Sequence, residues 1–125
     1  MDESQLGISM KTLHQYQEDI EHKQKVAFIR NHISDTARYM MLAEEAAEVS
    51  QAAAKIARIF EGSNPTPKTM TEAWGDLTEE MNDIFLAYEV ATGEPFKPEC
   101  NFFKIDRCVD RICEANDIFY PPTAS

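Results

Sequence analysis

The sequence predicts an all-α protein folded as an antiparallel four-helix bundle. Glycine and proline are few, 4 and 6 residues in a chain of 125, and they cluster as breakers at 62–67, at 93–98 and at 121–122. The long intervals between these breakers show almost no alternation of β-branched residues, so they are read as helices. Four helices joined by short links in a small chain favour an antiparallel bundle.

The helix ends follow from local signals. The first helix is expected over residues 9–30 with a break at 31–34. The second is expected over residues 35–60, with Asp35 as its cap and Gly62 and Pro65 as its stop.

The third helix begins after Thr69, because Thr69 and Glu72 have the spacing of a capping box. It ends near Thr92, where Gly93 can provide the C-terminal cap. The fourth helix is expected over residues 98–119, since a proline is tolerated in a first turn.

Length and composition indicate one domain over residues 1–125, with 43% hydrophobic residues to form its core. Lys and Arg total 12 and Asp and Glu total 22, which gives a formal net charge of −10. Such a chain is unsuited to a nucleic acid polymer, because gripping phosphates requires a basic surface. It is compatible with metal cations.

The cysteines predict a cytoplasmic location. There are three of them, Cys100, Cys108 and Cys113, without CxxC spacing, and an odd number without an export signal indicates a reducing compartment. No apolar stretch approaches the ~20 residues that cross a bilayer, so we expect no membrane partner.

Acidic residues occupy the apolar faces of the second and third helices. At 100° per residue, Met41, Val49 and Ala52 fall within about 40° of Glu45, so this glutamate lies in the middle of the apolar stripe. Glu48 lies on the edge of the stripe, and Glu80 with Asp83 repeats the pattern in the third helix. Surface helices normally place such residues on the opposite face.

If the two helices are neighbours, the two acidic pairs face each other. Like charges about 4 Å apart repel by roughly 4 kcal/mol at an effective dielectric near 20. Either the carboxyl groups are protonated or a cation lies among them, and oxygen ligands favour Mg²⁺, Mn²⁺ or Ca²⁺. A di-iron centre is excluded because it requires Glu-x-x-His, and the histidines precede both motifs. A solvated glutamate face is the ordinary alternative for either helix alone.

Glu44-Glu45-Ala46-Ala47-Glu48, followed by Glu80-Met81-Asn82-Asp83, resembles the EExxE…ExxD signature of the MazG-like all-α nucleoside triphosphate pyrophosphohydrolases. The similarity covers roughly residues 39–107. It includes Lys97, Asn101 and Lys104, in an arrangement like the family's basic and Asn residues.

The resemblance implies a MazG fold and a Mg²⁺ site, with Mn²⁺ as a possible substitute. The implied ligands are Glu45, Glu48, Glu80 and Asp83, and Glu44 would support a second ion or orient the attacking water, which makes Glu44 and Glu45 the catalytic candidates. Lys97, Asn101 and Lys104 would meet the triphosphate or sugar. Helix geometry adds Lys55, about 80° from Glu45 on the Glu48 side, as a candidate for phosphate oxygens or as a solvated lysine.

The family's reaction is hydrolysis of a (deoxy)nucleoside triphosphate to monophosphate and pyrophosphate, and it suggests nucleotide-pool house-cleaning. We also expect a homodimer or homotetramer, formed through the apolar faces of the second and third helices. The alternative is a catalytically degenerate helical module that binds nucleotide or protein. That alternative predicts that Mg²⁺ leaves the melting temperature unchanged.

Overall fold

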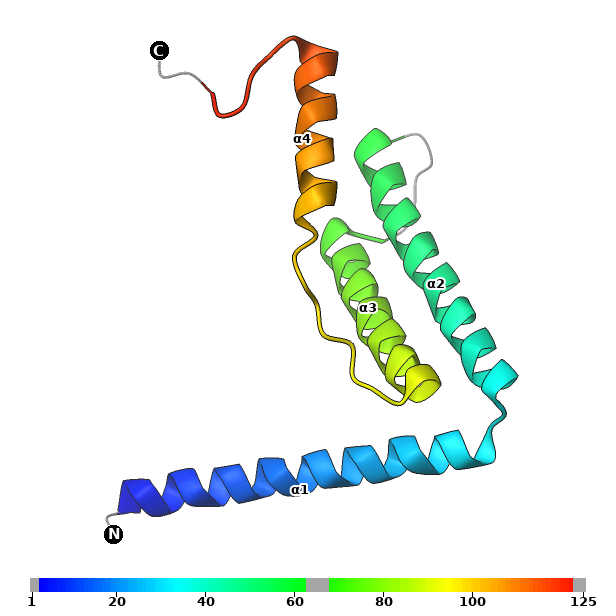
Figure 1. Ribbon diagram of the computed structural model, residues 1–125, viewed down its shortest axis with the longest axis vertical. Helices are drawn as coiled ribbons and strands as arrows, with labels where there is room; N and C mark the ends of the chain where they lie inside the picture. The colour runs from blue at the N-terminus through cyan, green and yellow to red at the C-terminus, as the bar shows by residue number, and fades with distance from the viewer. Residues whose placement is uncertain (1–2, 63–67, 123–125) are drawn as a thin grey trace.

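The computed structural model describes residues 3–62 and 68–122, which contain four α-helices and no strand (Figure 1). The helices are α1 (Glu3–His32), α2 (Asp35–Glu61), α3 (Met70–Thr92) and α4 (Phe102–Asn116). The predicted all-α class is confirmed. Pro65, part of the predicted stop after α2, lies outside the described residues.

The ends of α3 are those that the sequence predicts. The Thr69 hydroxyl accepts a hydrogen bond from the Glu72 backbone N–H at 3.1 Å, and the Glu72 carboxylate accepts one from the Thr69 N–H at 3.4 Å. Gly93 follows α3 with φ 86°, and its N–H donates to the Glu89 carbonyl at 2.8 Å. The predicted capping box and glycine cap are both confirmed.

The ends of the other three helices differ from the prediction. The N-cap of α2 is Ser34, whose hydroxyl accepts from the Ala37 N–H at 3.2 Å, so assigning Asp35 to the cap was wrong by one residue. The first helix begins at Glu3, earlier than expected. The fourth is shorter than 98–119, because Asn101 caps its start and Asp117 takes a left-handed conformation (φ 51°) at its end.

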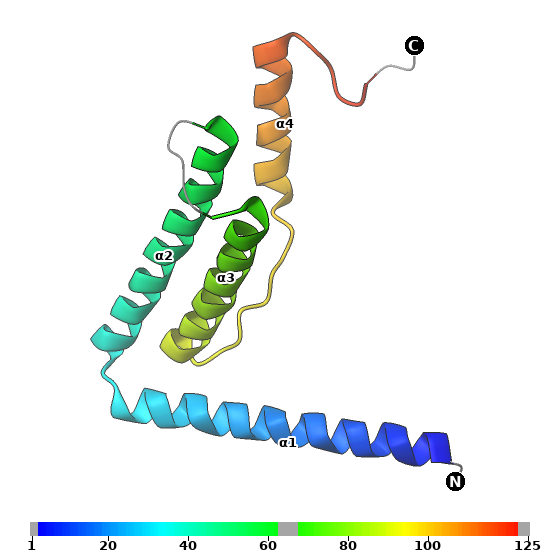
Figure 2. The ribbon, with the colours of Figure 1, turned by 180° about the vertical axis from the view of Figure 1, so that it is seen from behind.

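α2 and α3 form the central unit, an antiparallel pair lying side by side (Figure 1). α1 crosses the end of this pair where α2 begins and α3 ends, and it contacts α3. The segment after Gly93 returns along α3, where the Phe96 ring stacks on Phe85 with centroids 5.2 Å apart. α4 lies beyond the end of α3 where that helix begins, and it extends away from the α2–α3 pair (Figure 2). A closed four-helix bundle is therefore not confirmed in the single chain.

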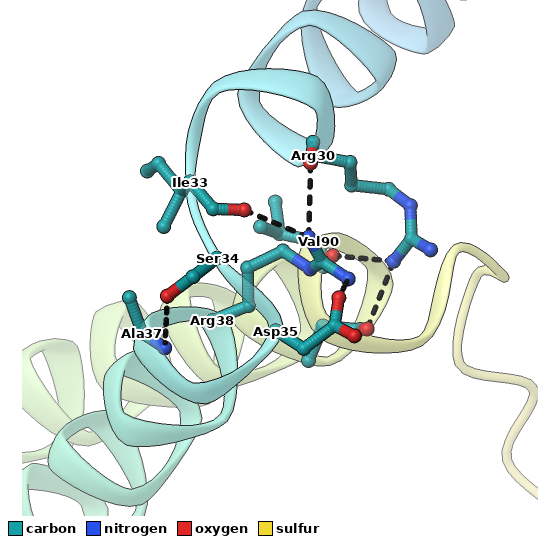
Figure 3. Close-up of polar contacts among 8 residues, drawn as sticks. Arg30, Ile33, Ser34, Asp35, Ala37, Arg38 and Val90 are labelled. Carbon is teal, nitrogen blue, oxygen red and sulfur yellow. Dashed lines mark hydrogen bonds and ion pairs between the residues drawn. The ribbon is translucent and has the colours of Figure 1, made fainter.

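Two arginines fix the corner between α1, α2 and α3 (Figure 3). The buried Arg38 donates to the carbonyls of Arg30 at 2.9 Å and Ile33 at 2.8 Å, and it forms an ion pair with Asp35. Arg30 donates to the carbonyls of Val90 and Ala91, at 2.7 and 2.8 Å. These bonds satisfy carbonyls at the C-terminal ends of α1 and α3, which otherwise lack partners.

The core is made of small side chains. The buried apolar residues are Val26, Ala52, Ala73, Ala87, Val90 and Ala91. Among the described residues no large side chain is fully buried, whereas Phe60, Phe103 and Phe119 are 74%, 82% and 81% exposed. Much of the apolar surface of the described residues therefore has no partner among them. In the described ranges, no helix is both long and apolar enough to cross a membrane.

Candidate functional site

Three of the predicted acidic residues converge between α2 and α3. Glu45 and Glu48 lie one turn apart on α2, Glu80 faces them from α3, and one carboxylate oxygen from each lies within 4.8 Å of the others. The sequence placed these residues on the apolar stripes of two helices, and the antiparallel packing of those stripes brings them together. We refer to Glu45, Glu48 and Glu80 as the carboxylate cluster.

Two oxygens of the carboxylate cluster lack any partner. Oε2 of Glu45 and Oε2 of Glu80 are buried and receive no hydrogen bond from the protein. Both glutamates are half-buried, whereas Glu48 is exposed at the rim. Because buried polar atoms in native proteins are nearly always satisfied, these oxygens call for a donor or a cation.

The surroundings of the carboxylate cluster disfavour its negative charge. Burial raises the pKa of Glu45 above its ordinary value, and the charges of Glu48, Asp83 and Glu44 raise it further. The pKa of Glu80 is raised by a hydrogen bond shared with the Glu48 carboxyl group, by burial, and by the charges of Glu48, Asp83 and Glu45. A hydrogen bond between two carboxyl groups requires a proton, so protonation and cation binding compete for this site.

The two remaining acidic candidates lie around the carboxylate cluster. Asp83 is exposed and acts on Glu45 and Glu80 through its charge, but its oxygens are not among the mutually close set. Glu44 is exposed and contributes the smallest of the effects on the Glu45 pKa.

A hollow of about 310 Å³ extends from the carboxylate cluster along the groove between α2 and α3. Lys55 lines it, so this predicted candidate shares a cavity with Glu48 and Glu80. Its remaining lining residues are Gln51, Ala52, Lys68, Ala73 and Asp76. The buried alanines leave the space that the hollow occupies.

Sequence reasoning missed Lys68 and Asp76, which form an ion pair across the hollow. A signal for Asp76 was present, because it lies four residues before Glu80 and thus on the same helical face. Lys68 precedes the Thr69 cap, outside any helical stripe, so periodicity could not place it.

The residues that the family resemblance implies for triphosphate or sugar binding lie outside the hollow. Lys97, Asn101 and Lys104 are exposed and do not line the hollow. Asn101 is exposed, and its Oδ1 accepts the Lys104 N–H at 3.0 Å as the cap of α4. The segment 94–101, which carries Lys97 and Asn101, runs along the flank of α3 away from α2, and Lys104 lies in the first turn of α4 (Figure 2).

No protein-family model, no curated protein and no solved structure matches this chain.

Proposed function

We propose that this protein is a Mg²⁺-dependent pyrophosphohydrolase that converts a (deoxy)nucleoside triphosphate to its monophosphate and pyrophosphate. The observation that carries the proposal is the carboxylate cluster, with its two buried and unpartnered oxygens. The fit is chemical: carboxylate oxygens are the ligands that hard divalent cations prefer. Mg²⁺, with Mn²⁺ as a substitute, would neutralise this charge and supply Lewis acidity when bound.

The residues around the hollow have distinct proposed roles. Glu45, Glu48 and Glu80 hold the cation, and Asp83 adds negative charge beside them. Glu44, exposed next to Glu45, orients the attacking water and accepts its proton. Water attacks the α-phosphorus, the bond to the β-phosphate oxygen breaks, and pyrophosphate leaves. Such a cation would allow a protein with a formal net charge of −10 to accept a triphosphate.

A homodimer or homotetramer is part of the proposal. The chain exposes 10,591 Å², whereas a folded monomer of 14.2 kDa exposes about 6,800 Å² by the scaling of surface with mass. Permanent interfaces bury about 2,000–5,000 Å² in total. The excess is therefore large enough for one or more such interfaces.

The exposed apolar residues indicate where other copies would pack. They lie on α1 and α4 as well as on α2 and α3, and they include Leu13 and Tyr16 on α1 and Phe102 and Ile112 on α4. Within such an oligomer, the Lys97, Asn101 and Lys104 of one copy could serve the hollow of another. The thiols of Cys100, Cys108 and Cys113 are all free, in keeping with the proposed cytoplasmic location.

The test is a panel of common and modified (d)NTPs, assayed with malachite green and a coupling pyrophosphatase in millimolar Mg²⁺. We expect turnover of at least one nucleotide, with release of the monophosphate, and complete loss of activity in EDTA. Glu80→Gln should lower activity by ~10²-fold or more, because the nucleophile depends on the cation. Glu79→Gln, an exposed neighbour outside the carboxylate cluster, is the matched control and should retain activity.

Light scattering provides a separate check on assembly. A mass near 14 kDa at micromolar concentration would contradict the proposed oligomer. An absence of turnover on every nucleotide, with a melting temperature indifferent to Mg²⁺, would favour the degenerate binding module.

A further inference from the structure

The charged side chains that line the hollow are separated by sign along its length. Glu48 and Glu80 lie at one end, and Lys55 and Lys68 line the other part of the same cavity. On α2 the seven residues from Glu48 to Lys55 correspond to about 10 Å along the helix axis. Lys55 therefore lies about two helical turns along α2 from Glu48, and Lys68 contacts Asp76, which lies one turn from Glu80 on α3.

Lys68 is paired within the hollow. Its Nζ contacts the Asp76 carboxylate, and the two side chains are 41% and 37% exposed, so both remain partly open to the cavity. Asp76 lies one turn before Glu80 on α3, between the lysine end and the carboxylate cluster. A ligand phosphate that reached Lys68 would compete with Asp76 for the same ammonium group.

We propose that Lys68 and Lys55 bind the terminal phosphate of a polyphosphate chain whose other end meets the carboxylate cluster, and that Asp76 is the counter-ion that Lys68 exchanges for this phosphate. This inference rests on the proposed function, and it adds the orientation of the substrate and two residues. The distance between the two ends selects for chain length. An orthophosphate held at the carboxylate cluster is too short to reach the lysines, whereas a triphosphate chain can extend toward them.

The experiment measures binding of inorganic tripolyphosphate and of orthophosphate by calorimetry in millimolar Mg²⁺, using the full-length chain. Lys55→Met and Lys68→Met should each weaken tripolyphosphate binding by about ten-fold, the size expected for a lost charge-assisted hydrogen bond. Lys25→Met, an exposed lysine on α1 outside the hollow, is the control and should bind like wild type. Orthophosphate binding should change little in any of these variants.

Asp76→Asn gives a prediction of opposite sign. It removes the negative charge that pairs with Lys68, so tripolyphosphate binding should tighten by roughly three-fold. The gain should be smaller when Lys68→Met is also present, because the effect of Asp76 acts partly through that lysine. Melting temperatures of all variants confirm that each is folded.

The outcomes separate this inference from the proposed function. If wild type binds tripolyphosphate and hydrolyses nucleotides, but Lys55→Met and Lys68→Met match Lys25→Met, the orientation is wrong and the function stands. Binding with the predicted lysine dependence, but without turnover of any nucleotide, supports the inference and contradicts the function. If wild type neither binds nor hydrolyses, both fail. Weaker binding in Asp76→Asn overturns the counter-ion role.

Discussion

Replacing Glu45 with Gln tests whether the carboxylate cluster is strained without a cation. The substitution removes one negative charge at nearly constant volume, beside Oε2 atoms that are buried and unpartnered. Two full charges 4.8 Å apart repel by about 3.5 kcal/mol at an effective dielectric of 20. Solvent at the exposed Glu48 reduces this figure.

We therefore expect the variant in EDTA to be as stable as wild type or more stable by up to ~1 kcal/mol. For a domain of this size, 1 kcal/mol corresponds to a rise in melting temperature of about 3–5 °C. Adding Mg²⁺ should favour wild type over the variant. It should stabilise wild type by RT ln(1 + [L]/Kd) and the variant much less, because one of the three proposed ligands has lost its charge.

Thermal melts of wild type and Glu45→Gln, each in EDTA and in millimolar Mg²⁺, provide the four melting temperatures needed. Glu79→Gln serves again as the charge-matched control, since it lies outside the carboxylate cluster. Equal Mg²⁺ shifts in Glu45→Gln and wild type would refute the assignment of a cation to the cluster. A destabilised variant in EDTA would instead show that Glu45 is a hydrogen-bonded core residue.

Three further results are expected. In EDTA, lowering the pH from neutral toward 4.5 should stabilise wild type relative to a Glu45→Gln/Glu80→Gln double variant. The pKa values of Glu45 and Glu80 are raised in the folded state, so the folded state binds more protons than the unfolded state in that pH window. Parallel curves of melting temperature against pH would contradict this. Gly93→Ala should destabilise by more than ~1 kcal/mol in urea unfolding, since its φ is 86° and a Cβ would lie 3.1 Å from Arg30 Cζ. Gly75→Ala, within α3 and facing open space, is its control and should be neutral or stabilising by up to ~1 kcal/mol. Arg38→Met should cost about 1–3 kcal/mol in the same assay, because it leaves the Arg30 and Ile33 carbonyls without their donor, and unchanged stability would show that these bonds contribute little.

The sequence predicted α3 and the carboxylate cluster well, for identifiable reasons. The Thr69 capping box and Gly93 are local signals whose geometry depends on few neighbours. Glu45 and Glu80 could be placed together because helical periodicity fixes their faces and the burial of apolar stripes fixes which faces meet. Both inferences need only short-range rules.

The parts that were not predicted depend on longer-range structure. Arg38 is charged and thus expected at the surface, yet it is buried at the corner where it binds carbonyls of another helix. The position of α4 depends on the path of residues 94–101 along α3, which Phe96 anchors by stacking. Lys68 enters the hollow only because the chain turns into α3 beside it. No periodic pattern encodes these contacts.

The alanines between α2 and α3 have a consequence for ion size. Ala52 and Ala73 are buried and both line the hollow, and Ala87 lies on the helical face of Glu80. Small side chains let two helices approach to the short end of the usual 8–10 Å separation. That separation sets how far apart the glutamates of α2 and α3 stand, and Mg²⁺ requires oxygen distances near 2.1 Å whereas Ca²⁺ accepts about 2.3–2.6 Å. The preference of the proposed cation site for a small or a large ion would therefore be set partly by methyl groups that never touch the ion.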